Sequence, residues 1–412
     1  MITNITTPLL ALTDVAIAGH LGDAVFIAAI AVGGTMFSTL FWLFGFLRMG
    51  SSGLTAQAVG ASDIREAHAV LARSLLLALT AGSAIIVGRY PLSDALMWLL
   101  DVDGRTAAVA VSYFRRVIWC APATLGLFAL NGWFVGMQNS RTPMWVSLAV
   151  DVLNIGASLA MVFMLHMGID GLATGTLAAQ WAGFLLMLAL AVRRYGFIRV
   201  PVRDIAAGLP RFFRINTDIF LRTLCLVAVT LWFTRIGAEQ GVDMLAVNAL
   251  LMQMFTLYSY FMDGLGVAAE ALCGRHYGAG DAMMLRRSVR SLFGVGGVLA
   301  AVFTLGYMTC GDMLLAFLSN DTGVVALARH YSGWAMAIPA AGFGAFMWDA
   351  VFIGLTHTRM MLLSMAMAML VFFLLCFLLT VPFGNHGLWM AFIAYLFTRG
   401  VILTVAYRSR IH

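Results

Sequence analysis

Acidic side chains interrupt several long apolar stretches of this 412-residue chain. In a membrane-spanning helix a carboxylate costs about 2.5–3.5 kcal/mol on insertion scales, so each one should have a partner or a purpose. Asp14 is the most isolated, because the run from Leu9 to Ile17 has no arginine within two helical turns. The acids inside apolar stretches are Asp14, Asp151, Asp218, Asp263, Glu270 and Asp349.

Asp14 is a candidate proton carrier. Burial disfavours the charged form of a carboxyl group, so this side chain could exchange a proton near neutral pH, which proton coupling requires. The alternative is a neutral acid that ties helices together by hydrogen bonding. The isolation of Asp14 favours a functional role.

A polar stripe in the apolar segment 142–166 supports the same candidate site as Asp14. Its members are spaced four, three and four residues apart, which puts them on one helix face: Ser147, Asp151, Asn154 and Ser158. Oxygen atoms from Asp14, Asn154 and a hydroxyl group would suit Na⁺, whereas a proton needs only the carboxylate. Interhelical hydrogen bonding, worth about 0.6 kcal/mol per contact, explains single serines but not a stripe of four.

The second half of the chain has its own acids. Asp263 and Glu270 are seven residues apart in the segment 244–272 and therefore share a helix face. Asp349 occupies the position equivalent to Asn131 in the internal repeat described below. Glu270 lies near a helix end, where pairing with Arg275 is as plausible as a functional role.

Arginines inside apolar segments are candidate partners for these acids. Arg48 is the candidate counter-charge of the first half, and with Asn131 we expect it to line the substrate cavity. Asp218 lies one helical turn from Arg214 and from Arg222, which predicts an ion pair at the membrane surface.

The composition requires lipid as the solvent for the elements that carry these residues. The chain is 62% hydrophobic and 11% charged, with a mean hydropathy of +0.92. Soluble domains are about 45–50% apolar and about 25% charged. Soluble enzymes, nucleic-acid-binding proteins and disordered chains are therefore excluded.

Twelve apolar segments are long enough to span a bilayer, which takes about 20 residues per helix. The runs do not alternate as the strands of a β-barrel do. We therefore predict an all-α polytopic membrane protein with an N-terminal six-helix lobe (1–195), a cytoplasmic linker (196–210) and a C-terminal six-helix lobe (211–412). The predicted helices are 3–20, 25–57, 68–90, 107–138, 142–166, 170–193, 211–236, 244–272, 283–308, 325–355, 359–381 and 386–407.

Arginine placement predicts the orientation. The chain has no lysine, and its loops carry sixteen arginines on one side of the predicted helices and six on the other. The positive-inside rule puts the richer side, with both termini and the linker, in the cytoplasm.

The two lobes repeat each other in sequence. The segment 136–141 matches 354–359, and 60–63 matches 278–281, both at an offset of 218. Six helices is an even number, so both copies enter from the same side and the repeat is parallel. Such repeats are typical of transporters, with a site near the midplane between or within the halves.

Other kinds of chemistry find little support. The five cysteines are scattered and no histidine has metal-ligand spacing, so neither a disulfide nor a metal site is expected. Phosphate-binding loops and nucleophile elbows are absent, so we expect no cofactor besides a coupling ion. An intramembrane enzyme would need a catalytic constellation at depth, but His166, His330 and His386 lie at helix ends.

The chain resembles the multidrug and toxic compound extrusion (MATE) family, in its DNA-damage-inducible F (DinF) branch. The resemblance covers nearly the whole chain. It rests on the segments 4–10 with Asp14, 19–22, 41–50, 53–57, 213–219, 263–264, 269–271, 277–279 and 349–354.

This resemblance implies alternating-access antiport of H⁺ or Na⁺ against lipophilic, often cationic compounds. It assigns ion coupling to Asp14, Asn154 and Thr176. Where relatives with the best-defined cation site carry an acid one turn after the Asn, this chain has Ser158, which weakens a Na⁺ site and favours H⁺. Asp151 is a possible substitute.

The predicted function is therefore a monomeric, cation-coupled efflux antiporter in the inner membrane of a bacterium. The alternative is a lipid-linked oligosaccharide flippase of the same superfamily. A flippase should have several arginines lining a central cavity, whereas most arginines here lie in loops.

Overall fold

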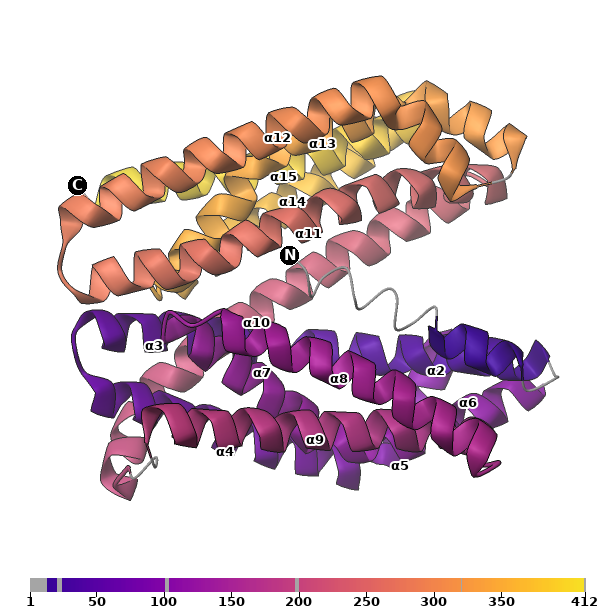
Figure 1. Cartoon of the computed structure of the whole chain (residues 1–412). Coiled ribbons are helices and arrows are strands. Elements are labelled where there is room, and N and C mark those ends of the chain that lie inside the picture. The colour runs from indigo at the N-terminus through magenta and orange to yellow at the C-terminus, as the bar shows by residue number, and fades with distance from the viewer. Residues whose placement is uncertain (1–12, 21–23, 101–103, 197–199, 320, 411–412) are drawn as a thin grey trace. The chain divides into compact units, whose positions relative to one another are not determined.

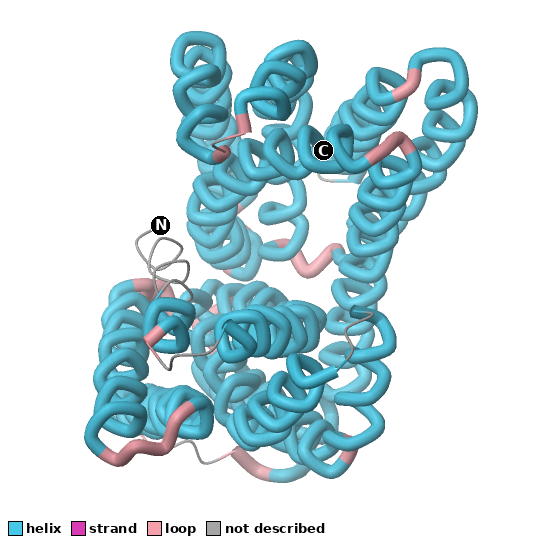
Figure 2. The backbone as a smooth tube through the Cα atoms, turned by 90° about the vertical axis from the view of Figure 1, so that its right-hand side faces the viewer, coloured by secondary structure: helices cyan, strands magenta, loops and turns pink. Residues whose placement is uncertain are grey.

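The computed structural model describes residues 13–20, 24–100, 104–196, 200–319 and 321–410. Every regular element in these ranges is a helix, and short loops join them (Figure 2). Eleven helical segments of the described chain are long and apolar enough to span a membrane. The predicted first span, 3–20, lies mostly outside the described residues, but its residues 13–19 are helical. The predicted all-α polytopic fold is confirmed.

Contacts between residues divide the chain into two units, Met1–Phe213 and Arg214–His412. The long helices of the first unit are α2 (Ala24–Trp42), α3 (Phe46–Gly60), α4 (Ile64–Val87), α5 (Arg89–Leu100), α6 (Gly104–Val117), α7 (Ala121–Gly136), α8 (Arg141–Leu159) and α9 (Ile169–Tyr195). Helix α10 (Val202–Glu239) passes from the first unit into the second. The remaining helices are α11 (Val242–Gly278), α12 (Ala282–Leu318), α13 (Thr322–Gly354), α14 (Thr358–Phe383) and α15 (Asn385–Arg410).

One helix lies at the centre of each unit. Almost every residue of α7 is buried, and so is most of the second half of α13. Helix α7 packs against α3, α4 and α9, whereas α13 packs against α11, α12 and α15. In Figure 1, α8 and α9 run side by side in the first unit.

The glycines of the repeat make equivalent contacts in both units. A Cβ atom on Gly136 of α7 would lie 2.8 Å from the carbonyl oxygen of Ser52 on α3. A Cβ atom on Gly354 of α13 would lie 2.6 Å from the carbonyl oxygen of Glu270 on α11. Ser52 and Glu270 are 218 residues apart, as are the two glycines, so the repeat is one of structure as well as sequence.

The turns repeat too. Gln138 and Thr356, just after α7 and α13, both adopt the left-handed conformation, with φ of 60° and 53°. Asp63 and Asp281 cap α4 and α12, because each carboxylate accepts a backbone hydrogen bond of 2.9 Å in the first turn. The predicted parallel repeat is confirmed.

Helix boundaries differ from the prediction in several places; α12, for example, ends at Leu318 instead of residue 308. Helix α5 lies where a loop was predicted. It is short and contains polar residues, so its sequence does not indicate a membrane span. Pro91 is tolerated because it lies in the first turn of the helix. Helix α10 begins at Val202 instead of residue 211. Arg73 of α4 donates to the carbonyl oxygens of Asp204 and Ile205 at 2.6 and 3.0 Å, a long-range contact that local sequence does not indicate.

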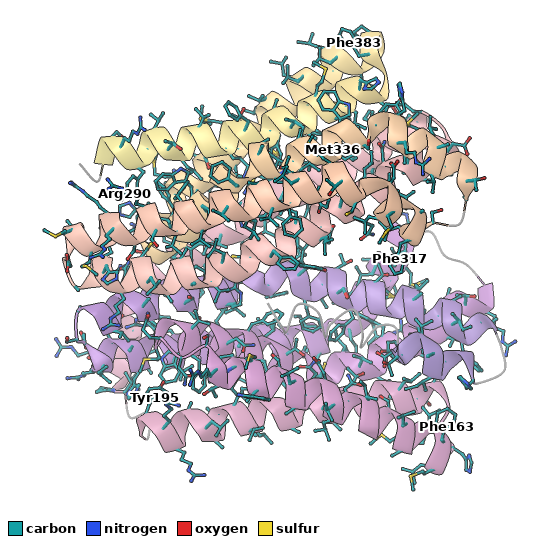
Figure 3. All side chains as sticks on the ribbon, turned by 45° about the horizontal axis from the view of Figure 1, so that its top comes forward. Phe163, Tyr195, Arg290, Phe317, Met336 and Phe383 are labelled. Carbon is teal, nitrogen blue, oxygen red and sulfur yellow. The ribbon has the colours of Figure 1, made fainter. Side chains whose placement is uncertain are left out.

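Large apolar side chains cover the outer surfaces of both units, as lipid contact requires. Phe163, Phe317 and Phe383, labelled in Figure 3, are 44%, 86% and 55% exposed. A water-soluble protein rarely exposes apolar side chains in such continuous patches.

The contact between α3 and α7 yields a stability prediction. A Cβ atom on Gly132 would lie 2.1 Å from the carbonyl oxygen of Arg48, so Gly132→Ala must push the two helices apart. We expect a loss of about 1–3 kcal/mol, seen as a lower midpoint of thermal unfolding in detergent. Gly34→Ala in α2 is the control, because no atom from another described element lies within 4 Å of its added Cβ. Equal midpoints for the two variants would contradict the close packing.

Candidate ion-coupling site

Three elements of the first unit surround Asp14. The helical residues 13–19 carry it, and their Ile17 and Ala18 belong to a buried apolar cluster. Tyr113 of α6 and Leu172 of α9 belong to the same cluster. Apolar packing on two sides thus fixes the position of the carboxyl group.

Asp14 has no counter-charge among the described residues. Its Oδ1 atom is buried and has no hydrogen-bond partner there. Tyr113, 5% exposed, is a polar neighbour whose hydroxyl interacts electrostatically with Asp14 and forms a hydrogen bond with the side chain of Thr176. Tyr113 therefore connects the isolated acid to α9.

A short chain of hydrogen bonds continues from Thr176 into α8. Asn154, 1% exposed, donates from Nδ2 to Thr176 Oγ1 at 3.3 Å. Ser158 donates from Oγ to Asn154 Oδ1 at 3.2 Å. Helices α8 and α9 approach closely here, because a Cβ atom on Gly175 would lie 2.5 Å from Ser158 Oγ.

The structure thus connects Asp14 through Tyr113 to Thr176, and Thr176 through Asn154 to Ser158. The other members of the predicted stripe are less buried: Asp151 and Ser147 are half-buried on α8. The stripe consequently divides into a buried part, Asn154 and Ser158, and a partly open part.

Tyr113 did not emerge from the sequence analysis, although a signal existed. It is the single tyrosine between Gly104 and Gly136. A tyrosine hydroxyl buried in an apolar helix normally finds a hydrogen-bond partner, so it marks a polar neighbour.

Tyr113→Phe tests this connection. Loss of the hydroxyl should slow ion-driven transport by about tenfold, which corresponds to about 1.4 kcal/mol, while the protein stays folded. Tyr307→Phe is the matched control, because it removes a buried hydroxyl that donates to Met254 at 2.6 Å in the other unit. The measurement is the initial transport rate per folded protein for each variant. An equal loss of rate in Tyr113→Phe and Tyr307→Phe would contradict a specific role for Tyr113.

Within the described chain, the buried acid Asp349 of the second unit has arginine partners, unlike Asp14 of the first. Asp349 of α13, 6% exposed, accepts hydrogen bonds from Arg222 of α10 at 2.5 Å and from Arg399 of α15. The predicted ion pair of Asp218 with Arg214 or Arg222 is wrong: among the described residues, Asp218 instead accepts a hydrogen bond from Thr358 at 2.9 Å. The helical spacing allowed that pair, but Asp349 offers Arg222 a partner on a facing helix.

The remaining predicted residues differ in how far they are buried. On α11, Glu270 is 3% exposed while Asp263 is exposed, so a shared helix face does not give them a shared environment. Arg48 on α3 and Asn131 on α7 are both half-buried.

The fold defines the class of protein. It is similar to a solved structure described as MATE in the bent conformation, with a TM-score of 0.89 and 20% sequence identity. The similarity covers 100% of this chain and 93% of that one. The chain therefore has the twelve-helix fold of MATE transporters.

A model of the MatE family matches residues 1–159 and 218–378, and this chain belongs to that family. DNA damage-inducible protein F of Escherichia coli (strain K12) is 37% identical over 98% of this chain and 89% of its own length. A probable multidrug resistance protein NorM of Bradyrhizobium diazoefficiens is 26% identical, over 99% and 91% respectively. The resemblance to the DinF branch is confirmed.

Proposed function

We propose that this protein is a cation-coupled antiporter that exports lipophilic, cationic compounds by alternating access. The observation that carries the proposal is the half-buried Asp14, whose inaccessible Oδ1 atom has no hydrogen-bond partner among the described residues and which Tyr113 connects to a polar chain. The relative named as a multidrug resistance protein supports the substrate class.

The arrangement favours H⁺ over Na⁺ as the coupling ion. A sodium site at Asp14, Asn154 and Thr176 needs their oxygen atoms to converge on one point. Here Asn154 presents its Nδ2 donor to Thr176, and its oxygen is engaged by Ser158. Asp14 alone can bind a proton without rearrangement of these partners.

In the proposed cycle, a proton from outside neutralises Asp14. The neutral side chain then permits the region around residues 13–19 to bend against α6 and α9, which expels the bound compound. Loss of the proton to the cytoplasm restores the charge and the affinity for a cationic substrate. No step needs a cofactor or a chemical conversion of the substrate.

We further propose a monomer in the inner membrane of a bacterium, with both termini cytoplasmic. The excess of arginines on one side of the helices supports this orientation. The working units are the lobes 1–195 and 211–412, joined by the linker 196–210.

The flippase alternative is less well supported. It needs several arginines whose guanidinium groups are all available to a large anionic substrate. Two arginines inside predicted helices, Arg222 and Arg399, each use a terminal guanidinium nitrogen to bind Asp349, so only part of each group is available.

Dye export from proteoliposomes tests the proposal. We expect a fluorescent lipophilic cation to be exported under an imposed proton gradient but not under a sodium gradient of equal size. Export driven by sodium alone would instead indicate a sodium ion bound by Asn154 and Thr176. Export under neither gradient, in protein shown to be folded, would contradict antiport.

A further inference from the structure

Positive charge exceeds negative charge at a buried cluster in the second unit. The cluster consists of Arg222, Asp349 and Arg399, which come from α10, α13 and α15. Arg222 is 9% and Arg399 is 3% exposed. Two guanidinium groups therefore share one carboxylate within the membrane-spanning helices, which leaves one positive charge without compensation.

Both guanidinium groups donate to the same oxygen, Asp349 Oδ2. Arg399 also donates from Nη1 to the Tyr395 hydroxyl at 3.4 Å, and Tyr395 in turn donates to the sulfur of Met365. The Nε–H groups of Arg222 and Arg399 remain: both are buried and have no hydrogen-bond partner among the described residues.

No other acid of the described chain forms an ion pair with these arginines. The nearest in sequence, Asp218, lies one turn before Arg222, but its carboxylate accepts the hydrogen bond from Thr358. An uncompensated buried charge costs several kcal/mol, and an unpaired buried donor adds to that cost. A bound anion would remove both costs.

We propose that the cluster binds a small monovalent anion through the free Nε–H donors of Arg222 and Arg399. Chloride and the carboxylate group of a small organic acid share the required chemistry, which is one negative charge with lone pairs for two charged donors. The proposal does not depend on cation-coupled antiport, because it concerns binding to the resting protein.

The test measures thermal unfolding of the purified full-length protein in detergent. Sodium gluconate, whose anion is much larger than chloride or acetate, is replaced stepwise by sodium chloride or sodium acetate at constant ionic strength. We expect the unfolding midpoint to rise by about 2–5 °C and to saturate. A higher unfolding midpoint in chloride alone, or in both salts, supports binding of a small anion. A higher midpoint in acetate alone identifies a carboxylate as the ligand.

Variants of the cluster should shift this response in opposite directions. Arg399→Gln and Arg222→Gln neutralise the excess charge and should abolish the response. Arg399→Lys loses the Nε–H donor but keeps the positive charge and the donors of its ammonium group, so part of the response should remain. Asp349→Asn raises the excess charge and should lower the half-saturating chloride concentration by about tenfold. If Asp349→Asn does not fold, the comparison of Arg399→Gln with Arg399→Lys decides.

Asp218→Asn is the matched control, because it makes the same chemical change on α10 outside the cluster, and its response should equal that of the wild type. Two results would overturn the proposal. One is an identical unfolding midpoint of the wild type in gluconate, chloride and acetate. The other is a full anion response in Arg399→Gln.

Discussion

Asp14→Asn is expected to reduce proton-driven dye export to the rate of protein-free liposomes. The amide keeps the size and polarity of the side chain but cannot bind or release a proton near neutral pH. The measurement is the initial rate of export after a pH jump, per folded protein.

Two further variants sharpen this prediction. Asp14→Glu keeps the carboxyl group and should retain part of the export. Asp170→Asn is the control, because Asp170 forms a half-exposed ion pair with Arg116 at 2.8 Å, and exposed pairs contribute only about 0–1 kcal/mol. Proton-driven export by Asp14→Asn at the rate of Asp170→Asn would exclude Asp14 as the proton carrier.

Asp349→Ala is expected to destabilise the protein by about 3–5 kcal/mol, because it leaves two buried guanidinium groups without their shared carboxylate. The unfolding midpoint in detergent should fall accordingly. Asp94→Ala is the control: its carboxylate is 70% exposed and pairs with Arg115 at 3.0 Å, so little change is expected. Equal midpoints for the two variants would mean that the buried cluster contributes no more than a surface pair.

Much of the fold could be predicted because lipid imposes simple rules on sequence. Spans must be apolar and about 20 residues long, and the repeated glycines and turns revealed the parallel repeat. Helix α5 and the start of α10 could not be predicted in this way. Helix α5 is too short and polar to show as a span, and the first turns of α10 are held by Arg73, which is distant in sequence.

The candidate site was predictable where residues of one helix share a face, as Asn154 and Ser158 do. It was not predictable where partners come from different helices. Tyr113 on α6 and Arg399 on α15 each meet an acid on another element, and spacing along one helix gives no sign of that. The same limit explains Asp218, for which a neighbour on its own helix was predicted but a hydroxyl on α14 is bound.

Proton release on substrate binding tests the central claim most directly. A lipophilic cation is added to purified protein in weakly buffered detergent solution near pH 7, and a pH-sensitive dye reports the released protons. If Asp14 exchanges a proton for the substrate, the wild type should release up to about one proton per bound cation, independently of sodium, and Asp14→Asn should release none. Saturable binding without proton release in the wild type, or equal release by Asp14→Asn, would contradict proton coupling through Asp14.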